Sequence, residues 1–221
     1  MSHHHSADHT ENTDDHFTQE FWDARYRSRT VWSGNPNPLL VEYVAGLTPG
    51  TVLDVGSGEG ADAIWLASRG WQVTGADLST VALEHAARNA AEAGEDIAGR
   101  ITWQHADFLT WDPAPRRFDL VSAQFMHLPR PSLEALYRRL AAAVNPGGTL
   151  LVVSHHPADL DTSMGRPMAV DTFVTGEEMA AVLDPDAWAS IVTAAPERMA
   201  SDPEGRQVVI RDAVLRAVRR G

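Results

Sequence analysis

The sequence predicts an α/β fold in which helices cover both faces of a mostly parallel sheet. Short apolar segments rich in β-branched residues alternate with helical patterns over most of the chain, and helical crossovers between such strands are typical of parallel sheets. A glycine-rich turn directly follows the first of these strands, where a following helix can bind a ligand at its N-terminus. With 221 residues, 43% of them hydrophobic, the chain suits one core rather than two.

The first 47 residues differ in pattern from the rest. Residues 1–16 contain five histidines and almost no aliphatic side chain, so we expect a disordered His-rich tail; loose binding of a divalent metal is its functional alternative. Residues 17–47 carry aromatic side chains near helical spacing, then a glycine- and proline-rich loop and a second helix from about Pro38. We therefore predict an N-terminal helical lid over residues 17–47 and a core over residues 48–221, together forming a single domain.

Within the core, strands and helices are expected to take turns. Five apolar segments are predicted as strands, at residues 51–55, 71–77, 100–106, 118–125 and 149–155. Helices are predicted after the glycine turn up to Ser68, over residues 79–93, from near Pro131 to before Asn145, and over residues 176–183. Two closing strands are predicted at residues 187–194 and 206–215.

Charge and composition exclude several classes of function. The 30 acidic residues against 18 basic ones, all arginine, give a formal net charge of −12, which phosphate backbones repel. We therefore expect no nucleic-acid partner. Because no apolar run is long enough for a bilayer, no secretory signal is evident and cysteine is absent, we expect a cytoplasmic protein without a membrane partner, a disulfide or a thiolate metal site.

The glycine turn reads L-D-V-G-S-G-E-G and is crowded by acids. Gly56 and Gly58 allow a ligand close to the backbone amides, which favour negative charge. Asp54 stands two residues before Gly56, and Glu59 lies inside the turn. These carboxylates repel a pyrophosphate and attract a ligand that carries an ammonium and a sulfonium. The alternative for Asp54 is a helix-cap or turn acid.

A further carboxylate, Asp77, stands where the second predicted strand ends. An acid at that position can accept hydrogen bonds from both hydroxyls of an unmodified ribose. The alternative for Asp77 is capping of the next helix, a role that Ser79 fills better.

These motifs appear in a recognisable order. L-D-V-G-S-G-E-G, V-T-G-A-D-L-S, H-A-D-F, F-D-L-V-S-A-Q-F-M-H-L and N-P-G-G-T-L-L-V together resemble the successive motifs of class I S-adenosylmethionine-dependent methyltransferases. The resemblance implies a Rossmann-like, seven-stranded sheet whose last strand is antiparallel, with S-adenosylmethionine as the cofactor across the carboxyl ends of the strands. It further implies a cofactor site made of Asp54, Gly56, Gly58, Asp77, Leu78, Asp107, Phe108 and Gln124. In this reading Gly56 and Gly58 contact the methionine part, Asp77 the ribose, and Asp107 and Phe108 the adenine. Gln124, or the backbone just before it, faces the sulfonium end.

The histidines at the strand ends bear on the acceptor. His127 follows the fourth predicted strand and is the candidate catalytic base, with packing or positioning as its alternative. His155 ends the fifth strand and is a candidate substrate contact, whereas the neighbouring His156 should point to the opposite face. We predict no metal centre, because adjacent histidines on a strand chelate poorly.

The expected lid extends the resemblance. F-W-D-A-R-Y followed by V-W-S-G-N-P-N-P-L-L is similar to the N-terminal region of the thiopurine and tellurite-resistance branch of small-molecule methyltransferases. In that branch aromatic residues line the acceptor pocket, which implies substrate contacts from Trp22, Tyr26 and Trp32. Helix packing is their alternative. Residues 157–174 match no substrate signature, so the acceptor stays unnamed.

The predicted function is methyl transfer from S-adenosylmethionine to a small-molecule acceptor, which is a thiol, a chalcogen oxyanion, a heterocycle or a hydroxyl. A monomer or a homodimer is expected. The alternatives are a non-catalytic protein that binds S-adenosylmethionine or metal, and an NAD-dependent oxidoreductase.

Overall fold

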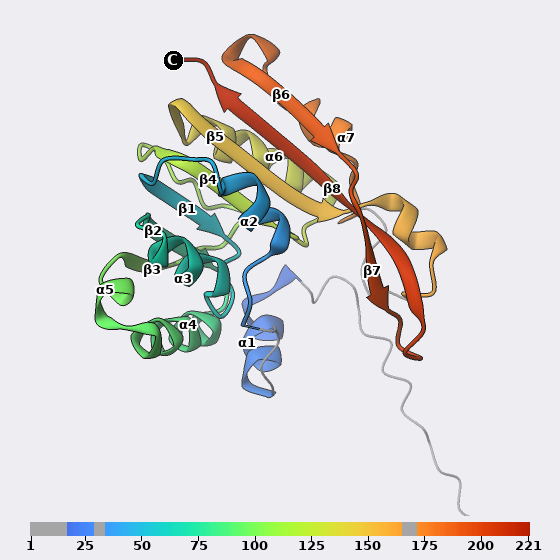
Figure 1. Ribbon diagram of the computed structural model, residues 1–221, viewed down its shortest axis with the longest axis horizontal. Helices are drawn as coiled ribbons and strands as arrows, with labels where there is room; N and C mark the ends of the chain where they lie inside the picture. The colour runs from blue at the N-terminus through green and yellow to red at the C-terminus, as the bar shows by residue number, and fades with distance from the viewer. Residues whose placement is uncertain (1–16, 29–33, 165–171) are drawn as a thin grey trace, which may run out of the picture.

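The computed structural model describes residues 17–28, 34–164 and 172–221. Figure 1 shows one twisted sheet with helices on both of its faces. The strands are β1 Thr51–Val55, β2 Gln72–Asp77, β3 Ile101–His105, β4 Phe118–Gln124, β5 Val144–His155, β6 Trp188–Ala194, β7 Glu197–Ser201 and β8 Gln207–Arg219. The helices are α1 Gln19–Ser28, α2 Pro38–Val44, α3 Ala61–Ser68, α4 Thr80–Ala93, α5 Glu95–Ala98, α6 Arg130–Ala142 and α7 Gly176–Ala180, with 3-10 turns η2 Pro157–Asp161 and η4 Pro185–Ala187.

The sheet has the predicted mostly parallel arrangement. Its order is β3-β2-β1-β4-β5-β8-β6, and β1 to β5 pair in parallel. The last strand, β8, runs antiparallel to both β5 and β6. The prediction of a Rossmann-like sheet with helices on both faces is therefore confirmed.

One strand of the structure was not predicted. β7 pairs antiparallel with the first part of β8, so that β8 has β5 on one side and β6 followed by β7 on the other. Pro196 separates β6 from β7, because proline has no N–H to donate to a ladder. The sequence of β7 is polar and short, and only the 13-residue length of β8 supplies its partner.

Each face of the sheet has its own core. Leu133 and Leu136 of α6 pack on one face together with Met179 of α7, whereas Leu40 of α2 and Leu66 of α3 pack on the other. All five side chains are almost completely buried. Burial of a leucine of this kind contributes about 1.5–3 kcal/mol, so these helices hold the sheet that positions the site.

The helix boundaries agree with the predicted ones except near the end of the chain. α4 begins after Ser79, whose side chain accepts from the amide of Ala82 at 3.1 Å, as a helix cap does. α7 ends at Ala180 although a helix to Leu183 was expected. Pro185 disfavours helical geometry in the residue before it, and residues 181–183 form turns instead.

In the described parts of the chain, no helix has the length and apolar character that crossing a membrane requires.

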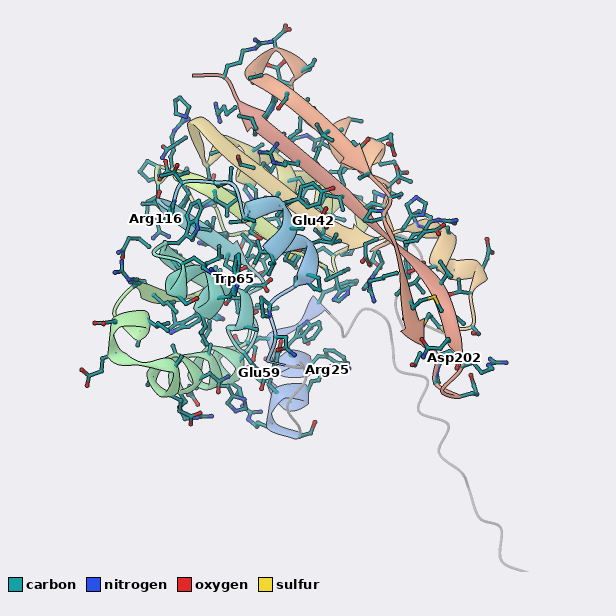
Figure 2. The ribbon with its side chains drawn as sticks, viewed as in Figure 1. Arg25, Glu42, Glu59, Trp65, Arg116 and Asp202 are labelled. Carbon is teal, nitrogen blue, oxygen red and sulfur yellow. The ribbon has the colours of Figure 1, made fainter. Side chains whose placement is uncertain are left out.

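Figure 2 places Asp202 in the hairpin formed by β7 and β8, far from the helices that follow β1 and β2.

Candidate active site

The glycine turn connects β1 to α3 and is hydrogen-bonded to the carboxyl end of β2. Gly56, Gly58 and Gly60 have φ of +74°, +52° and +89°, a region that favours glycine. The amides of Gly56 and Ser57 both donate to the carbonyl of Ala76, at 2.8 and 3.0 Å. A Cβ on Gly56 would lie 2.9 Å from Sδ of Met126. The turn therefore needs glycine both for its backbone angles and for its close neighbour.

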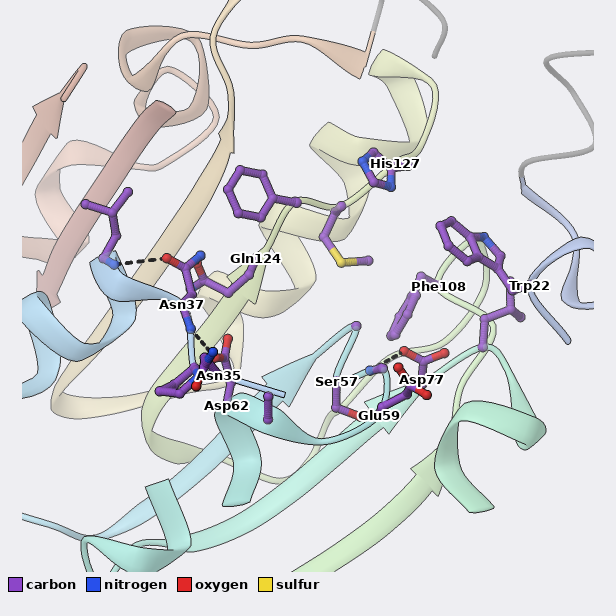
Figure 3. Close-up of a pocket in the computed structure, with 18 of the residues that line it drawn as sticks. Trp22, Asn35, Asn37, Ser57, Glu59, Asp62, Asp77, Phe108, Gln124 and His127 are labelled. Carbon is purple, nitrogen blue, oxygen red and sulfur yellow. Dashed lines mark hydrogen bonds between the residues drawn. The ribbon is translucent and has the colours of Figure 1, made fainter. Parts of the chain in front are cut away.

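A cavity of about 1090 Å³ lies along this edge of the sheet. It is lined by the glycine turn, by the residues after β2, β3 and β4, by the segment before α2, by α1 and by the start of β7 (Figure 3). Of the predicted site residues, the lining includes Trp22, Tyr26, Gly56, Gly58, Asp77, Leu78, Asp107, Phe108, Gln124 and His127. The structure thus gathers most of them around one space.

Asp77 lines the cavity beside the glycine turn. Its Oδ2 accepts from the amide of Gly58 and its Oδ1 from the amide of Ser79, both at 2.8 Å. Burial raises the pKa of Asp77 to about 6, although the bonds from Ser79 and Gly58 oppose that rise. Each carboxylate oxygen has a second lone pair, so both can still accept from a ligand.

Asp54 lies beneath the turn rather than on the cavity wall. Its side chain is 2% exposed, and its Oδ2 has no hydrogen-bond partner among the described residues. Burial raises the pKa of Asp54 well above its usual value, and the neighbouring charges of Asp62 and Asp77 add to the rise. A buried carboxylate oxygen without a partner is costly, so the site favours a cation nearby.

Sequence reasoning missed a polar cluster formed by Asn37, Asp62 and Gln124. The amide of Asn37 donates to Oδ1 of Asp62 at 2.6 Å, and its side chain donates to Oε1 of Gln124 at 2.9 Å (Figure 3). Burial raises the pKa of Asp62 to about 6. The position of Asp62 in the first turn of α3 was a visible signal, because acids favour that turn. Nothing in the sequence showed that Asn37 would reach it.

The far side of the cofactor region is formed by the residues after β2 and β3. Leu78, Asp107 and Phe108 line the cavity there. Asp107 is exposed, and its Oδ1 accepts from the amide of Leu109 at 3.0 Å. Phe108 is buried and meets Trp111 edge-on, with 5.9 Å between ring centroids. Phe108 offers an apolar ring face and Asp107 a hydrogen-bond acceptor, and this combination suits a purine.

Aromatic rings form the opposite end of the cavity. The ring of Trp22 lies parallel to that of His127, with centroids 6.0 Å apart and 9° between planes. His155 follows on the other side of His127 at 5.8 Å, and Phe125 stacks on His155 at 4.5 Å. This row of rings, Trp22, His127, His155 and Phe125, is here called the aromatic row.

One predicted substrate residue, His155, does not line the cavity. His155 is buried behind His127 and Phe125 and is not among the described residues that line the cavity. The side chain of His155 packs against Phe125 and His127 rather than on the cavity wall, so the geometry does not predict a direct contact with an acceptor. Trp32 lies outside the described residues.

Phe125 and the start of β7 also line the cavity, and no local sequence pattern predicted either contribution. Phe125 has φ of +51°, which costs a non-glycine residue of order 1–3 kcal/mol and clusters at functional sites. Arg198 of β7 lines the cavity together with Asp212 of β8. Their side chains form an ion pair, with Nε of Arg198 2.6 Å from Oδ2 of Asp212.

Comparison with known proteins agrees with this geometry. Residues 52–148 match the family described as a methyltransferase domain. A 2-heptyl-1-hydroxyquinolin-4(1H)-one methyltransferase of Mycobacteroides abscessus is 30% identical over 65% of this chain and 69% of its own length. The chain belongs to the class I S-adenosylmethionine-dependent methyltransferases.

Two further similarities accompany this family membership. A probable thiol methyltransferase 2 of Arabidopsis thaliana is 30% identical to the methyltransferase over 69% of this chain and 66% of its own length. A structure from work on the conversion of a disulfide bond into a thioacetal group during echinomycin biosynthesis has a TM-score of 0.71, with 24% identity and 91% of each chain covered.

The residues of this methyltransferase fit S-adenosylmethionine as the cofactor. The unpartnered Oδ2 of Asp54 suits the neighbourhood of an ammonium group, and the turn at Gly56 leaves the backbone open to close approach. Asp54, Glu59 and Asp77 are buried around the turn, and their carboxylates disfavour the pyrophosphate of NAD. Among the described residues, no group of three or more His, Asp or Glu side chains is arranged to hold a metal ion.

Proposed function

We propose that this methyltransferase methylates a hydroxyl group on a small planar acceptor, and that His127 takes the proton of that hydroxyl. The observation that carries the proposal is the position of His127. It lines the cavity across from Asp77, and its ring lies between those of Trp22 and His155 (Figure 3). S-adenosylmethionine supplies an electrophilic methyl group when it is bound. A neutral hydroxyl becomes a better nucleophile for that group when a base removes its proton.

The acids divide the work of holding the cofactor. Asp77 accepts from the ribose hydroxyls, and Asp54 with Asp62 provides the negative field for the ammonium group. Asp107 and Phe108 hold the adenine, and Gly56, Gly58 and Leu78 contact the remainder. Gln124 is already bonded to Asn37 and Ser122, so it is held in place beside the methyl end.

A planar acceptor is supported by the shape of the aromatic row. Trp22 and Phe125 present ring faces or edges to the cavity, and Tyr26 closes its side. Aromatic walls bury flat apolar rings and keep water from the methyl group. The relative from Mycobacteroides abscessus acts, by its name, on a hydroxylated quinolone, which belongs to this class of acceptor.

A thiol is the second candidate acceptor, because the Arabidopsis relative is named as a thiol methyltransferase. A thiol with a pKa near 8.5 is partly ionised at neutral pH and depends less on a base than a hydroxyl does. The effect of removing His127 therefore distinguishes the two acceptors.

The test has two stages. First, thermal unfolding is followed with S-adenosylmethionine, S-adenosylhomocysteine and NAD; saturation at 100 times Kd stabilises by about 2.7 kcal/mol. Second, hydroxylated heteroaromatic compounds and thiols are screened with the wild type and with His127→Gln. A loss of at least 100-fold in kcat with hydroxyl acceptors supports the proposal. Stabilisation by NAD alone, or equal turnover of a hydroxyl acceptor by both proteins, contradicts it.

The net charge of −12 supports a small-molecule acceptor rather than a nucleic acid. The cytoplasmic location and the monomeric or homodimeric state remain predictions.

A further inference from the structure

The helix α1 is fixed to the core by a buried acid that the reaction itself does not use. Asp23 lies in the middle of α1 and is 7% exposed. Its Oδ1 accepts from Oγ of Ser79 at 2.6 Å and from the amide of Val81 at 3.3 Å. These two partners begin α4, which follows directly after Asp77.

The same contact continues into the proposed ribose site. Ser79 is fully buried, and its amide donates to Oδ1 of Asp77 at 2.8 Å. Its hydroxyl also caps α4 by accepting from the amide of Ala82. Ser79 therefore bonds at once to the carboxylate of α1 and to the carboxylate at the end of β2.

The residues on either side of Asp23 explain why its docking matters. Trp22, the residue before Asp23, lies in the aromatic row, and Tyr26, about one helical turn after Asp23, lines the cavity. Trp22 and Tyr26 pack on Val81 and Ala82 at the contact between α1 and α4. A helix of ten residues is marginal by itself, so its docking depends on these apolar contacts together with the polar contacts of Asp23.

The charge of Asp23 is well placed for this contact. Burial raises the pKa of Asp23, but the hydrogen bonds from Ser79, Val81 and Gln19 outweigh that effect and leave the pKa below its usual value. A carboxylate beside the first turn of α4 also interacts favourably with the helix dipole. The acid is therefore ionised at neutral pH, when Ser79 donates to it.

We infer that Asp23 is a positioning residue, which docks α1 against Ser79 and thereby couples closure of the aromatic end of the cavity to the cofactor site at Asp77. The coupling rests on the proposed role of Asp77. Since Asp23 touches neither the cofactor residues nor the cavity directly, it acts through Ser79 and through the placement of Trp22 and Tyr26.

The experiment measures amide hydrogen exchange in α1 and the Kd of S-adenosylhomocysteine in the full chain. Asp23→Ala should lower the protection of residues 19–28 at least ten-fold while the rest of the protein keeps its protection, and should weaken cofactor binding about five- to twenty-fold. Glu20→Ala, which removes an exposed acid from the same helix, should change neither quantity. Asp23→Asn keeps an acceptor for Ser79 and should recover part of both losses; it also decides the question if the alanine variant does not fold.

A double-mutant cycle separates coupling from a general loss of stability. Ser79→Ala removes the hydroxyl that Asp23 contacts, so the double variant should weaken binding no more than about the stronger single variant. Fully additive effects, unchanged protection of α1, or lost protection with unchanged affinity would each overturn the inference. Failure of the wild type to bind S-adenosylhomocysteine would instead overturn the proposed function, because loss of α1 protection does not depend on the ligand.

Discussion

Asp77 connects three parts of the site through its two carboxylate oxygens. One oxygen holds the glycine turn through the amide of Gly58, and the other holds the start of α4 through the amide of Ser79. Its carboxylate thus has a structural role in the free protein before any ribose reaches it. The side chain is buried for that reason, and its raised pKa follows from the burial.

We predict that Asp77→Ala weakens binding of S-adenosylhomocysteine ten-fold or more, which corresponds to about 1.4 kcal/mol or more. The variant loses the acceptors for the ribose hydroxyls and frees the turn. Titration calorimetry measures the affinity, with the exposed Asp96→Ala as the control. An unchanged affinity would remove Asp77 from the site.

The raised pKa values of Asp62 and Asp77 also predict how cofactor binding depends on pH. Asp62 and Asp77 have pKa values of about 6 in the folded protein against 3.8 as the usual value. The folded protein therefore holds more protons than the unfolded chain between about pH 4 and 6, and the contribution of these acids to stability falls as pH rises through that window. A bound cation reverses the effect, because it stabilises the ionised carboxylates.

Cofactor binding should consequently release protons and weaken as the pH falls below 6. At pH 5 a carboxyl of pKa about 6 is mostly protonated, which costs about ten-fold in affinity for each acid that must ionise. Calorimetry between pH 5 and 7.5 tests this, and Asp62→Asn should flatten the curve. Equal affinity at both ends of the range would show that neither acid must be ionised for the cofactor to bind.

At the scale of elements, packing between β2, β3 and the glycine turn sets the geometry of the site. The indole of Trp103 in β3 covers Gly75 of β2, and a Cβ on Gly75 would lie 2.5 Å from Cζ3 of that ring. Gly60, which precedes α3, faces the same indole, and a Cβ on Gly60 would lie 2.8 Å from its Cη2. One tryptophan therefore fixes the distance between a strand and the turn.

Gly75→Ala should lower the free energy of unfolding by about 1–3 kcal/mol, because the added methyl group overpacks this contact. Gly46→Ala, where nothing lies within 4 Å, is the matched control. In a Trp103→Leu background the same substitution should cost less. Denaturant unfolding measures the wild type and all four variants, and an equal cost of Gly75→Ala in both backgrounds would mean that Trp103 is not the obstacle.

At the scale of the whole molecule, β7 extends the sheet beyond the predicted seven strands and, together with β8, adds a wall to the cavity. The ion pair between Arg198 and Asp212 joins these two strands, and the carboxylate is 3% exposed whereas the arginine is 45% exposed. The hairpin of β7 and β8 thereby contributes Arg198 and Asp212 to the wall of the cavity.

We predict that Arg198→Ala destabilises the protein by about 1–3 kcal/mol, since it leaves Asp212 buried without its partner. Adding Asp212→Asn should restore most of that loss. Arg198→Ala should also change KM for the acceptor more than Kd for the cofactor, because Arg198 lies at the β7 end of the cavity. A change confined to cofactor affinity would place the acceptor elsewhere.

The sequence by itself determined the alternation of strands and helices, the glycine turn and the positions of Asp77, Phe108 and His127 at strand ends. These features are local: a period of hydrophobicity, a backbone angle or a strand end lies within a few residues, and parallel strands bring their carboxyl ends to one edge.

Only the tertiary structure decided which distant side chains meet. The bonds from Asn37 to Asp62, from Asp23 to Ser79 and from Arg198 to Asp212 join segments whose separation along the chain carries no periodic signal. The same holds for His155, which the strand pattern placed at the site and which packing turned beneath it. Contacts of this kind depend on the shape of the packed core, and no local pattern of residues records that shape.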